Sequence, residues 1–369
     1  SCQAQPELAL AERGLRGQVV GIAALDQLRV VNLGHNRLNG SLPAFSNQLE
    51  RLLLSNNFFD GPVPCASEML ADLELDRNDL EGAIPGCLLD GPRLSTLDLG
   101  HNRLDGPLPR VTQLSSRLQT LRLPQAGLSG SLDALANLTN LVHLDLSRNF
   151  LTGTLSQTLL DTWAHLVDVD LSWNYLEGEV PDLPSQILKV DLGHNALGGT
   201  LGTQFASFRE NQRHGLSGWL RLNENGFCGP LPTIFYDLLY DTHVVTNLDV
   251  SGNHFRCSVS NRHFEAWARA TGHDFGECTP VALVTAVSGN LVPGGLVTVA
   301  GSFVASTSTK CAFTSGDVRS VVEAAYVSPS ELLCSLPPDW PPGRTVVNAA
   351  HYCDDFSSVV TLGDLYAPV

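Results

Sequence analysis

Three aspartates occupy one recurring position of this 369-residue chain and are its strongest candidates for chemistry. Asp145, Asp170 and Asp191 each stand between two apolar residues, in Leu-Asp-Leu or Val-Asp-Leu. If these segments form adjacent strands, the carboxylates lie about 4.8 Å apart. Carboxylates this close repel one another unless a cation, a basic group or a polyhydroxyl ligand neutralises or hydrogen-bonds them. They are candidate ligand contacts, together with Asp168 and Trp173 beside them; the alternative is that aspartate is the ordinary residue at this position.

Three histidines share a second outward position and suggest a metal site. His35, His101 and His194 fall on the first, fourth and eighth copies of the repeat, so neighbours in this set lie at least about 14 Å apart. Zinc ligands lie within roughly 2.1 Å of one ion, which excludes a shared site. The chain also contains no Gly-x-Ser-x-Gly, no His-Glu-x-x-His and no phosphate-binding glycine loop. We expect no metal, no cofactor and no catalytic activity.

A sequence motif that recurs ten times between Leu28 and Phe255 must position these side chains. It consists of a leucine-rich block, an asparagine, a leucine and usually a glycine, with steps of 21 to 30 residues between copies. This is close to the period of leucine-rich repeats, roughly 20–29 residues. We expect the asparagine to be buried and to bond backbone groups of neighbouring loops. Its position holds Asn36, Asn57, Asn78, Asn102, Ala126 as the one exception, Asn149, Asn174, Asn195, Asn225 and Asn253.

The two-residue period of a strand sets which side chains face outward. In each Leu-x-Leu core the leucines point inward and the residue between them points outward. Stacked copies bury a continuous apolar core and form a contact scaffold with an open concave face. The predicted outward row is Asn32, Leu53, Glu74, Asp98, Arg122, Asp145, Asp170, Asp191, Arg221 and Asp249.

The ends of five copies resemble a known family. Gly40-Ser-Leu-Pro43, Gly61-Pro-Val-Pro64, Gly82-Ala-Ile-Pro85, Gly106-Pro-Leu-Pro109 and Gly178-Glu-Val-Pro181 are similar to the plant-type leucine-rich repeat. That subfamily includes receptor ectodomains and polygalacturonase-inhibiting proteins. The resemblance covers residues from about 20 to 278 and implies an α/β solenoid. We therefore expect a leucine-rich repeat domain with terminal caps over residues 1–278, with a capping segment between Cys257 and Cys278.

The leucine-rich motif does not recur after Thr279. From there on, short runs of β-branched residues separated by Pro and Gly predict a small β-sandwich. The succession Val292-Pro-Gly-Gly295, Val299-Ala-Gly-Ser-Phe303, Cys311-Ala-Phe313 and Leu332-Leu-Cys334 resembles the IPT/TIG immunoglobulin-like domain. The fold class predicted for the whole chain is thus a solenoid of about ten repeats plus a C-terminal all-β immunoglobulin-like sandwich over 279–369. The resemblance implies a disulfide between Cys311 and Cys334 and a role as spacer or contact module.

Nine cysteines without a Cys-x-x-Cys pair indicate disulfides rather than a metal or redox motif. Cys65 and Cys87 follow the proline of successive copies, so stacking can bring them together. Cys257 can pair with Cys278 or with Cys228 on the adjacent copy. If it pairs with Cys278, then Cys2, Cys228 and Cys353 are left over as free or intermolecular thiols. The sequons at Asn39 and Asn137, and a chain that begins at Ser1 as if a signal peptide were removed, add to an extracellular prediction.

Charge limits the class of partner. The formal charge of −16 and only two lysines argue against nucleic acid, and no apolar run reaches the roughly 18 residues of a membrane span. Two inserts, 203–215 and 233–246, are further candidate contact sites, and helical packing on the convex side is the alternative explanation of the second. The main functional prediction is a secreted, self-associating adhesion or structural glycoprotein, plausibly filamentous. The alternatives are a receptor-like ectodomain that recognises a peptide or glycan on the concave face, and an inhibitor of a wall-degrading enzyme.

Overall fold

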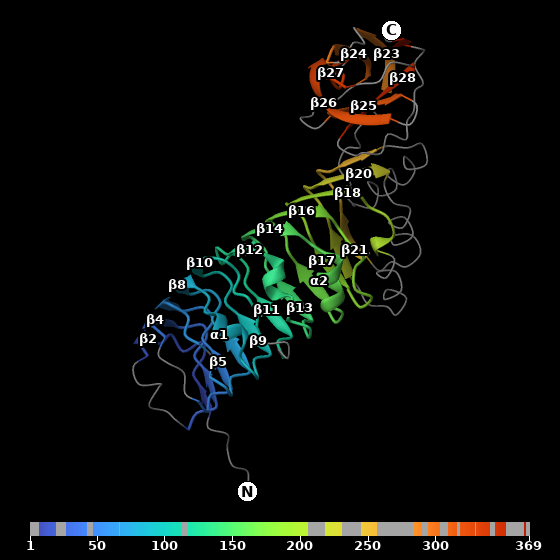
Figure 1. The fold of residues 1–369 in the computed structure, drawn as a ribbon. Coiled ribbons are helices and arrows are strands. Elements are labelled where there is room, and N and C mark those ends of the chain that lie inside the picture. Colours follow the sequence, from blue (N-terminus) through green and yellow to red (C-terminus); the bar gives the residue numbers. More distant parts are fainter. Residues whose placement is uncertain are drawn as a thin grey trace. The chain divides into compact units, whose positions relative to one another are not determined.

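The computed structural model divides the chain into two compact units (Figure 1). One comprises Ser1–Gly198, Gly202–Asn225 and Ile234–Val250, and the other comprises Gly199–Leu201, Gly226–Thr233 and Ser251–Val369. The structure describes residues 7–19, 27–42, 47–65, 67–112, 117–205, 218–230, 245–256, 283–289, 294–302, 309–315, 318–328, 330–339, 344–351 and 365–366. The predicted domain boundary at 278/279 and most of both inserts lie outside these residues and stay predictions.

The first unit is built on an eleven-stranded parallel sheet, here called the first sheet. The middle apolar residue of each strand from β3 onward is buried, whereas its neighbours face outward. This confirms the predicted repeat, and the strand register places the whole predicted outward row in one line. The strands are β1 (Glu7–Ala9), β3 (Val30–Asn32), β5 (Arg51–Leu53), β7 (Asp72–Glu74), β9 (Thr96–Asp98), β11 (Thr120–Arg122), β13 (His143–Asp145), β15 (Asp168–Asp170), β17 (Lys189–Asp191), β19 (Gly218–Arg221) and β21 (Val245–Asp249).

Strand β1 was not predicted, because its copy of the repeat motif carries Arg13 in place of the asparagine. The missing side chain is replaced from the next repeat. Asn36 Oδ1 accepts hydrogen bonds from the backbone N–H groups of Arg13 and Leu15, at 3.1 and 3.0 Å. A terminal repeat that departs from the consensus is expected of a solenoid cap.

Short strands on a second side of each coil form further parallel ladders. The first ladder contains β2 (Arg16–Gln18), β4 (Arg37–Ser41), β6 (Phe58–Gly61), β8 (Asp79–Ala83) and β10 (Arg103–Asp105). A new ladder begins with β12 (Ser129–Ser131) and continues through β14 (Phe150–Thr154), β16 (Tyr175–Glu179) and β18 (Ala196–Thr200). The coils of β10 and β12 are joined by a single bridge between Pro107 and Ser129, at which the Leu108 N–H donates to the Ser129 carbonyl oxygen and the Ser129 N–H to that of Gly106, each at 2.9 Å. Backbone pairing therefore continues past Ala126, which stands in the asparagine column.

The asparagine column joins successive coils, as predicted. The side chains are buried or half-buried, and in most copies Nδ2 donates to carbonyl oxygens of its own turn and of the preceding coil, while Oδ1 accepts from a backbone N–H of that coil. The described helical segments between the ladders are short, at most six residues: α1 (Gly86–Leu89), η2 (Leu132–Leu135), α2 (Gln157–Thr162) and η3 (Thr203–Phe205). The core contains the leucine columns and the fully buried Phe59, Trp163, Phe205 and Phe227. No described helix is long and apolar enough to cross a membrane.

The second unit includes the parallel pair β20 (Gly226–Pro230) and β22 (His254–Arg256). Its remaining described strands pair in antiparallel fashion and are β23 (Leu283–Gly289), β24 (Leu296–Ser302), β25 (Thr309–Ser315), β26 (Val318–Ser328), β27 (Glu331–Ser335), β28 (Arg344–His351) and β29 (Leu365–Tyr366). The antiparallel pairing agrees with an all-β segment. The IPT/TIG identity of residues 279–369 stays a prediction.

Two predicted disulfides are confirmed. Cys65 bonds to Cys87 and Cys311 bonds to Cys334, with Cα–Cα distances of 5.6 and 6.3 Å. Cys228 is also disulfide-bonded, which removes it from the candidates for a free or intermolecular thiol. Cys2, Cys257, Cys278 and Cys353 lie outside the described residues. Of the two sequon asparagines, Asn39 is exposed, whereas Asn137 is half-buried and donates to the Val111 carbonyl oxygen at 2.8 Å.

Candidate functional site

The outward face of the first sheet carries two rows of side chains, from the first and third residues of each short strand. In the third-residue row, the register from β11 to β19 aligns Arg122, Asp145, Asp170, Asp191 and Arg221. The sequence therefore predicted correctly that the three aspartates lie on adjacent strands. We call the outward side chains of β5 to β21 the first-sheet face.

Each aspartate of this row caps the turn that follows its own strand. Asp145 Oδ1 accepts hydrogen bonds from the Ser147 N–H at 3.0 Å and the Ser147 hydroxyl at 2.7 Å. Asp170 Oδ1 accepts the same pair from Ser172, at 3.0 and 2.6 Å. The aspartates thus have a structural role in the repeat, as the alternative interpretation held. The two interpretations are compatible, because this role uses only one oxygen of each carboxylate.

Asp191 differs from its two neighbours in being neutralised. It is only 7% exposed, its Oδ1 accepts from the Gly193 N–H at 3.0 Å, and its Oδ2 lies 3.4 Å from a guanidinium nitrogen of Arg221. Within the described part of the chain, Asp145 and Asp170 have no such ion pair. Between β11 and β19, the carboxylates of this row without an ion pair are therefore Asp145 and Asp170.

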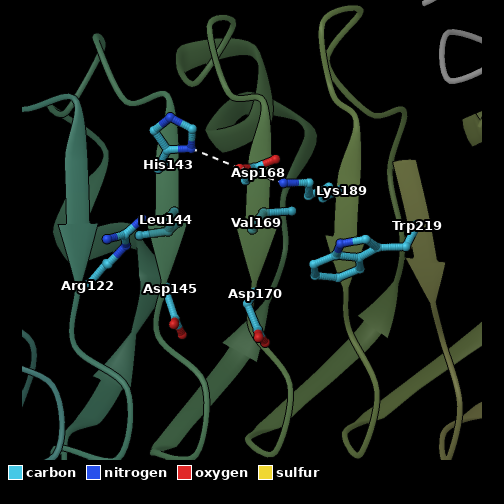
Figure 2. Close-up of a pocket in the computed structure, with 9 residues that line it drawn as sticks. All are labelled: Arg122, His143, Leu144, Asp145, Asp168, Val169, Asp170, Lys189 and Trp219. Atoms are coloured by element: carbon cyan, nitrogen blue, oxygen red, sulfur yellow. Dashed lines mark hydrogen bonds and ion pairs between the residues drawn. The ribbon is translucent and has the colours of Figure 1, made fainter. Parts of the chain in front are cut away.

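Asp168 belongs to the first-residue row and lies between a histidine and a lysine. Its Oδ2 lies 3.0 Å from His143 Nδ1 and 3.6 Å from Lys189 Nζ. Its Oδ1 is buried, without a hydrogen-bond partner among the described residues. Figure 2 shows this cluster, from β13, β15 and β17, above the side chains of Asp145 on β13 and Asp170 on β15.

A shallow depression of about 180 Å³ lies at the centre of this face (Figure 2). Arg122 from β11 and Trp219 from β19 border it, and Leu144 and Val169 contribute apolar surface. The indole of Trp219 extends from β19 toward β15 (Figure 2). Sequence reasoning missed Trp219 because it followed only the residue between the two core leucines. The same two-residue period also turns the residue before that core outward, and this signal gives Thr120, His143, Asp168, Lys189 and Trp219.

Trp173 lies outside the depression, in the turn after β15. It has a left-handed φ of 57°, in a column shared with His35, His101, Arg148 and His194. Its ring stacks on His194 at a centroid distance of 3.7 Å, and the Arg148 guanidinium lies 5.1 Å from the ring centroid. Trp173 therefore holds neighbouring turns together beside the first-sheet face. The three histidines stand in separate repeats of this column, and the described residues include no group of side chains that could hold a metal.

Burial changes the acidity of this row. Desolvation raises the pKa of Asp170 to about 6, and the charges of Asp191 and Asp145 add to the rise. Desolvation likewise raises the pKa of Asp98 to about 6 and, by a smaller amount, the pKa values of Glu74 and Asp191. A carboxyl group whose pKa is higher in the folded chain binds its proton more tightly there. Holding these groups ionised at neutral pH consequently costs stability.

Acidification from pH 7 to pH 5 is expected to stabilise the solenoid through Asp170. Between the unfolded pKa near 3.8 and the folded pKa of about 6, only the folded state retains the proton, so stability falls as pH rises through this window. The gain from pH 7 to pH 5 is about 1 kcal/mol for this group. Urea unfolding at both pH values should show a smaller pH effect in Asp170→Asn than in the wild type. Exposed Asp133→Asn is the control, and an unchanged pH effect in Asp170→Asn would contradict the assignment.

Comparisons with known proteins identify the architecture. The Leucine Rich Repeat family model matches residues 140–161, and no curated protein sequence matches the chain. The Arabidopsis receptor kinase HAESA ectodomain, solved with an N-terminally extended IDA peptide hormone, is 28% identical, with a TM-score of 0.55 over 66% of this chain and 41% of that one. The structure of HAESA with IDA and the co-receptor SERK1 is 27% identical, with a TM-score of 0.57 over 68% of this chain and 42% of that one. The PEPR1–AtPEP1 structure is 27% identical, with a TM-score of 0.59 over 68% of this chain and 35% of that one.

These similarities support a leucine-rich repeat solenoid like that of plant receptor ectodomains. The chain spans less than half the length of each of these solved chains. With the disulfides, the similarity favours an extracellular location.

Proposed function

We propose that this chain is a non-catalytic extracellular recognition module that binds an extended peptide on the first-sheet face. The observation that carries the proposal is the depression between β11 and β19, where two ion-pair-free aspartates adjoin an indole and apolar surface. A small number of placed polar groups in a mostly pre-formed hollow is typical of ligand sites. Asp145 and Asp170 contact the ligand; Asp168 and Asp191, each held by cations, border it; and Trp173 fixes the adjacent turn.

The similar proteins support a peptide rather than another ligand class. Two of the similar structures, both of HAESA, contain the peptide hormone IDA, and one of them also contains the co-receptor SERK1. The likeness covers about two thirds of this chain. We extend peptide binding to this chain as a proposal, with a protein partner, an LRR domain over 1–278 and an IPT/TIG-like spacer over 279–369.

The other predicted functions have weaker support. Within the described residues, we find no observation that favours filament assembly, glycan binding or inhibition of a wall-degrading enzyme. The rings of Phe150 on β14 and Tyr175 on β16 are exposed and stacked, with centroids 6.3 Å apart. Because these strands belong to the second ladder, which begins at β12, and not to the first sheet, the two rings supply a matched control surface.

The proposal is tested by selecting 12-residue peptides from a random phage-displayed library on the purified chain. Enriched peptides should bind the wild type and lose at least tenfold in affinity on Asp170→Ala with Trp219→Ala. The variant Thr120→Trp adds bulk to the same face without removing a contact and should have a similar effect. Phe150→Ala with Tyr175→Ala should bind normally, and circular dichroism verifies folding of every variant. A library that yields no binder, or binders indifferent to all first-sheet variants, contradicts the proposal.

A further inference from the structure

The charge of the first-sheet face is concentrated in one of its two rows. Between β7 and β21, the third-residue row holds six carboxylates and two guanidinium groups, a formal charge of −4: Glu74, Asp98, Arg122, Asp145, Asp170, Asp191, Arg221 and Asp249. The first-residue row from β5 to β19 is balanced, with Arg51 and Lys189 against Asp72 and Asp168. A ligand that lies across both rows therefore meets a net negative surface.

Several acidic groups on this face are neutralised from within the chain. Arg51 Nε lies 2.8 Å from Asp72 Oδ2, Arg221 pairs with Asp191, and Asp168 contacts Lys189. In the described part of the chain, Glu74, Asp98, Asp145 and Asp170 lack such a partner, and of these four Asp145 and Asp170 line the depression. The mutual repulsion of these two carboxylates contributes to the raised pKa of Asp170. An incoming cation would relieve the repulsion and replace part of the hydration lost by burial.

The size of the depression suits one side chain rather than a whole small-molecule ligand. Its volume of about 180 Å³ is below the roughly 300 Å³ at which small-molecule pockets begin. Asp145 and Asp170 extend in the same direction from adjacent strands (Figure 2). Serine contacts occupy Oδ1 of each, which leaves Oδ2 for a ligand. Strands about 4.8 Å apart place the two carboxylates within reach of one guanidinium or ammonium group.

We infer that the peptide bound on the first-sheet face carries a lysine or arginine whose cationic head lies between Asp145 and Asp170, beside the Trp219 indole. The inference rests on the proposed function and specifies the chemistry of its ligand. The indole face is a favourable neighbour for a cation, as the Arg221 guanidinium 4.9 Å from the same ring already illustrates. Arg122 and Lys189 border the depression and disfavour a second cation close by, so a single basic side chain is the expected anchor.

The test pairs charge-removing changes on both partners. Asp145→Asn with Asp170→Asn keeps the oxygen that accepts from the serines, so the turns are preserved. The matched control is Asp98→Asn, in the same row two strands from Asp145. Each lysine or arginine of a selected peptide is replaced in turn by glutamine, and affinities are measured by calorimetry at two salt concentrations.

The expected result is at least a tenfold loss for the double asparagine variant, less than a twofold loss for Asp98→Asn, and weaker binding at higher salt. One peptide substitution should weaken binding to the wild type tenfold and have no further effect on the double variant. If peptide binding is lost with Trp219→Ala and with Thr120→Trp but tolerates the double asparagine change, the inference is overturned and the proposed function stands. Selection of acidic peptides would do the same. Absence of any face-dependent peptide would remove both.

Discussion

Alanine in place of Gly127 is expected to destabilise the solenoid by about 4 kcal/mol or more, the largest single-residue effect that the structure predicts. Gly127 has a φ of +71°, and a Cβ atom there would overlap the backbone carbonyl oxygen of Leu104. Left-handed backbone alone costs a non-glycine residue about 1–2 kcal/mol. The overlap adds to this cost, because the carbonyl belongs to the neighbouring coil and cannot rotate away as a side chain can.

Gly82→Ala is the matched control for this prediction. Gly82 has a similar φ of +81°, but a Cβ atom there would meet nothing within 4 Å. Urea unfolding followed by circular dichroism should place Gly82→Ala within about 2 kcal/mol of the wild type. If Gly127→Ala is no less stable than Gly82→Ala, the inferred close contact between residue 127 and the Leu104 carbonyl oxygen is wrong.

Asn149→Ala is expected to lower the free energy of unfolding by about 3 kcal/mol or more, because the asparagine side chain forms hydrogen bonds with five backbone groups. Nδ2 donates to the carbonyl oxygens of Leu123, Leu146 and Ser147 at 2.8, 2.9 and 3.1 Å. Oδ1 accepts from the N–H groups of Ala126 and Leu128, at 3.1 and 3.0 Å. The bond to the Ala126 N–H reaches into a coil that has no asparagine of its own. Asn149 is 4% exposed, so water replaces these bonds poorly.

Half-buried Asn137 supplies the comparison for Asn149. Its Nδ2 donates a hydrogen bond to the Val111 carbonyl oxygen at 2.8 Å, and we expect Asn137→Ala to cost only about 1 kcal/mol. Urea midpoints of the two alanine variants measure the difference. Equal midpoints would show that the asparagine column is not a principal source of cohesion between coils.

The solenoid could be predicted from the sequence because its determinants are local and repeated. Each Leu-x-Leu gives a strand, each asparagine gives a buried bridge, and copies of nearly equal length must align in register. The row from Arg122 to Arg221 and the disulfide between Cys65 and Cys87 follow from that register alone. β1 was missed where Arg13 replaces the asparagine, since the search depended on the most regular residue.

The depression could not be predicted from the row of aspartates. It also needs the first-residue row, and Trp219 enters it from beyond an insert that lengthens the chain between β17 and β19. Trp173 was placed among the ligand contacts by its nearness in sequence to Asp170, whereas its left-handed turn directs it to His194 and Arg148. Side-chain packing between coils decides both outcomes, and a one-dimensional pattern does not contain it.

Site-specific photo-crosslinking tests peptide binding on the first-sheet face most directly. A benzophenone side chain is placed at Thr96 on β9, next to Thr120 in register, or at exposed Thr152 on β14 of the second ladder. Each protein is irradiated with a peptide selected on the wild-type chain and examined by mass spectrometry. We predict a covalent adduct from position 96 and none from position 152. An adduct from position 152 without one from position 96 would contradict peptide binding on the first-sheet face.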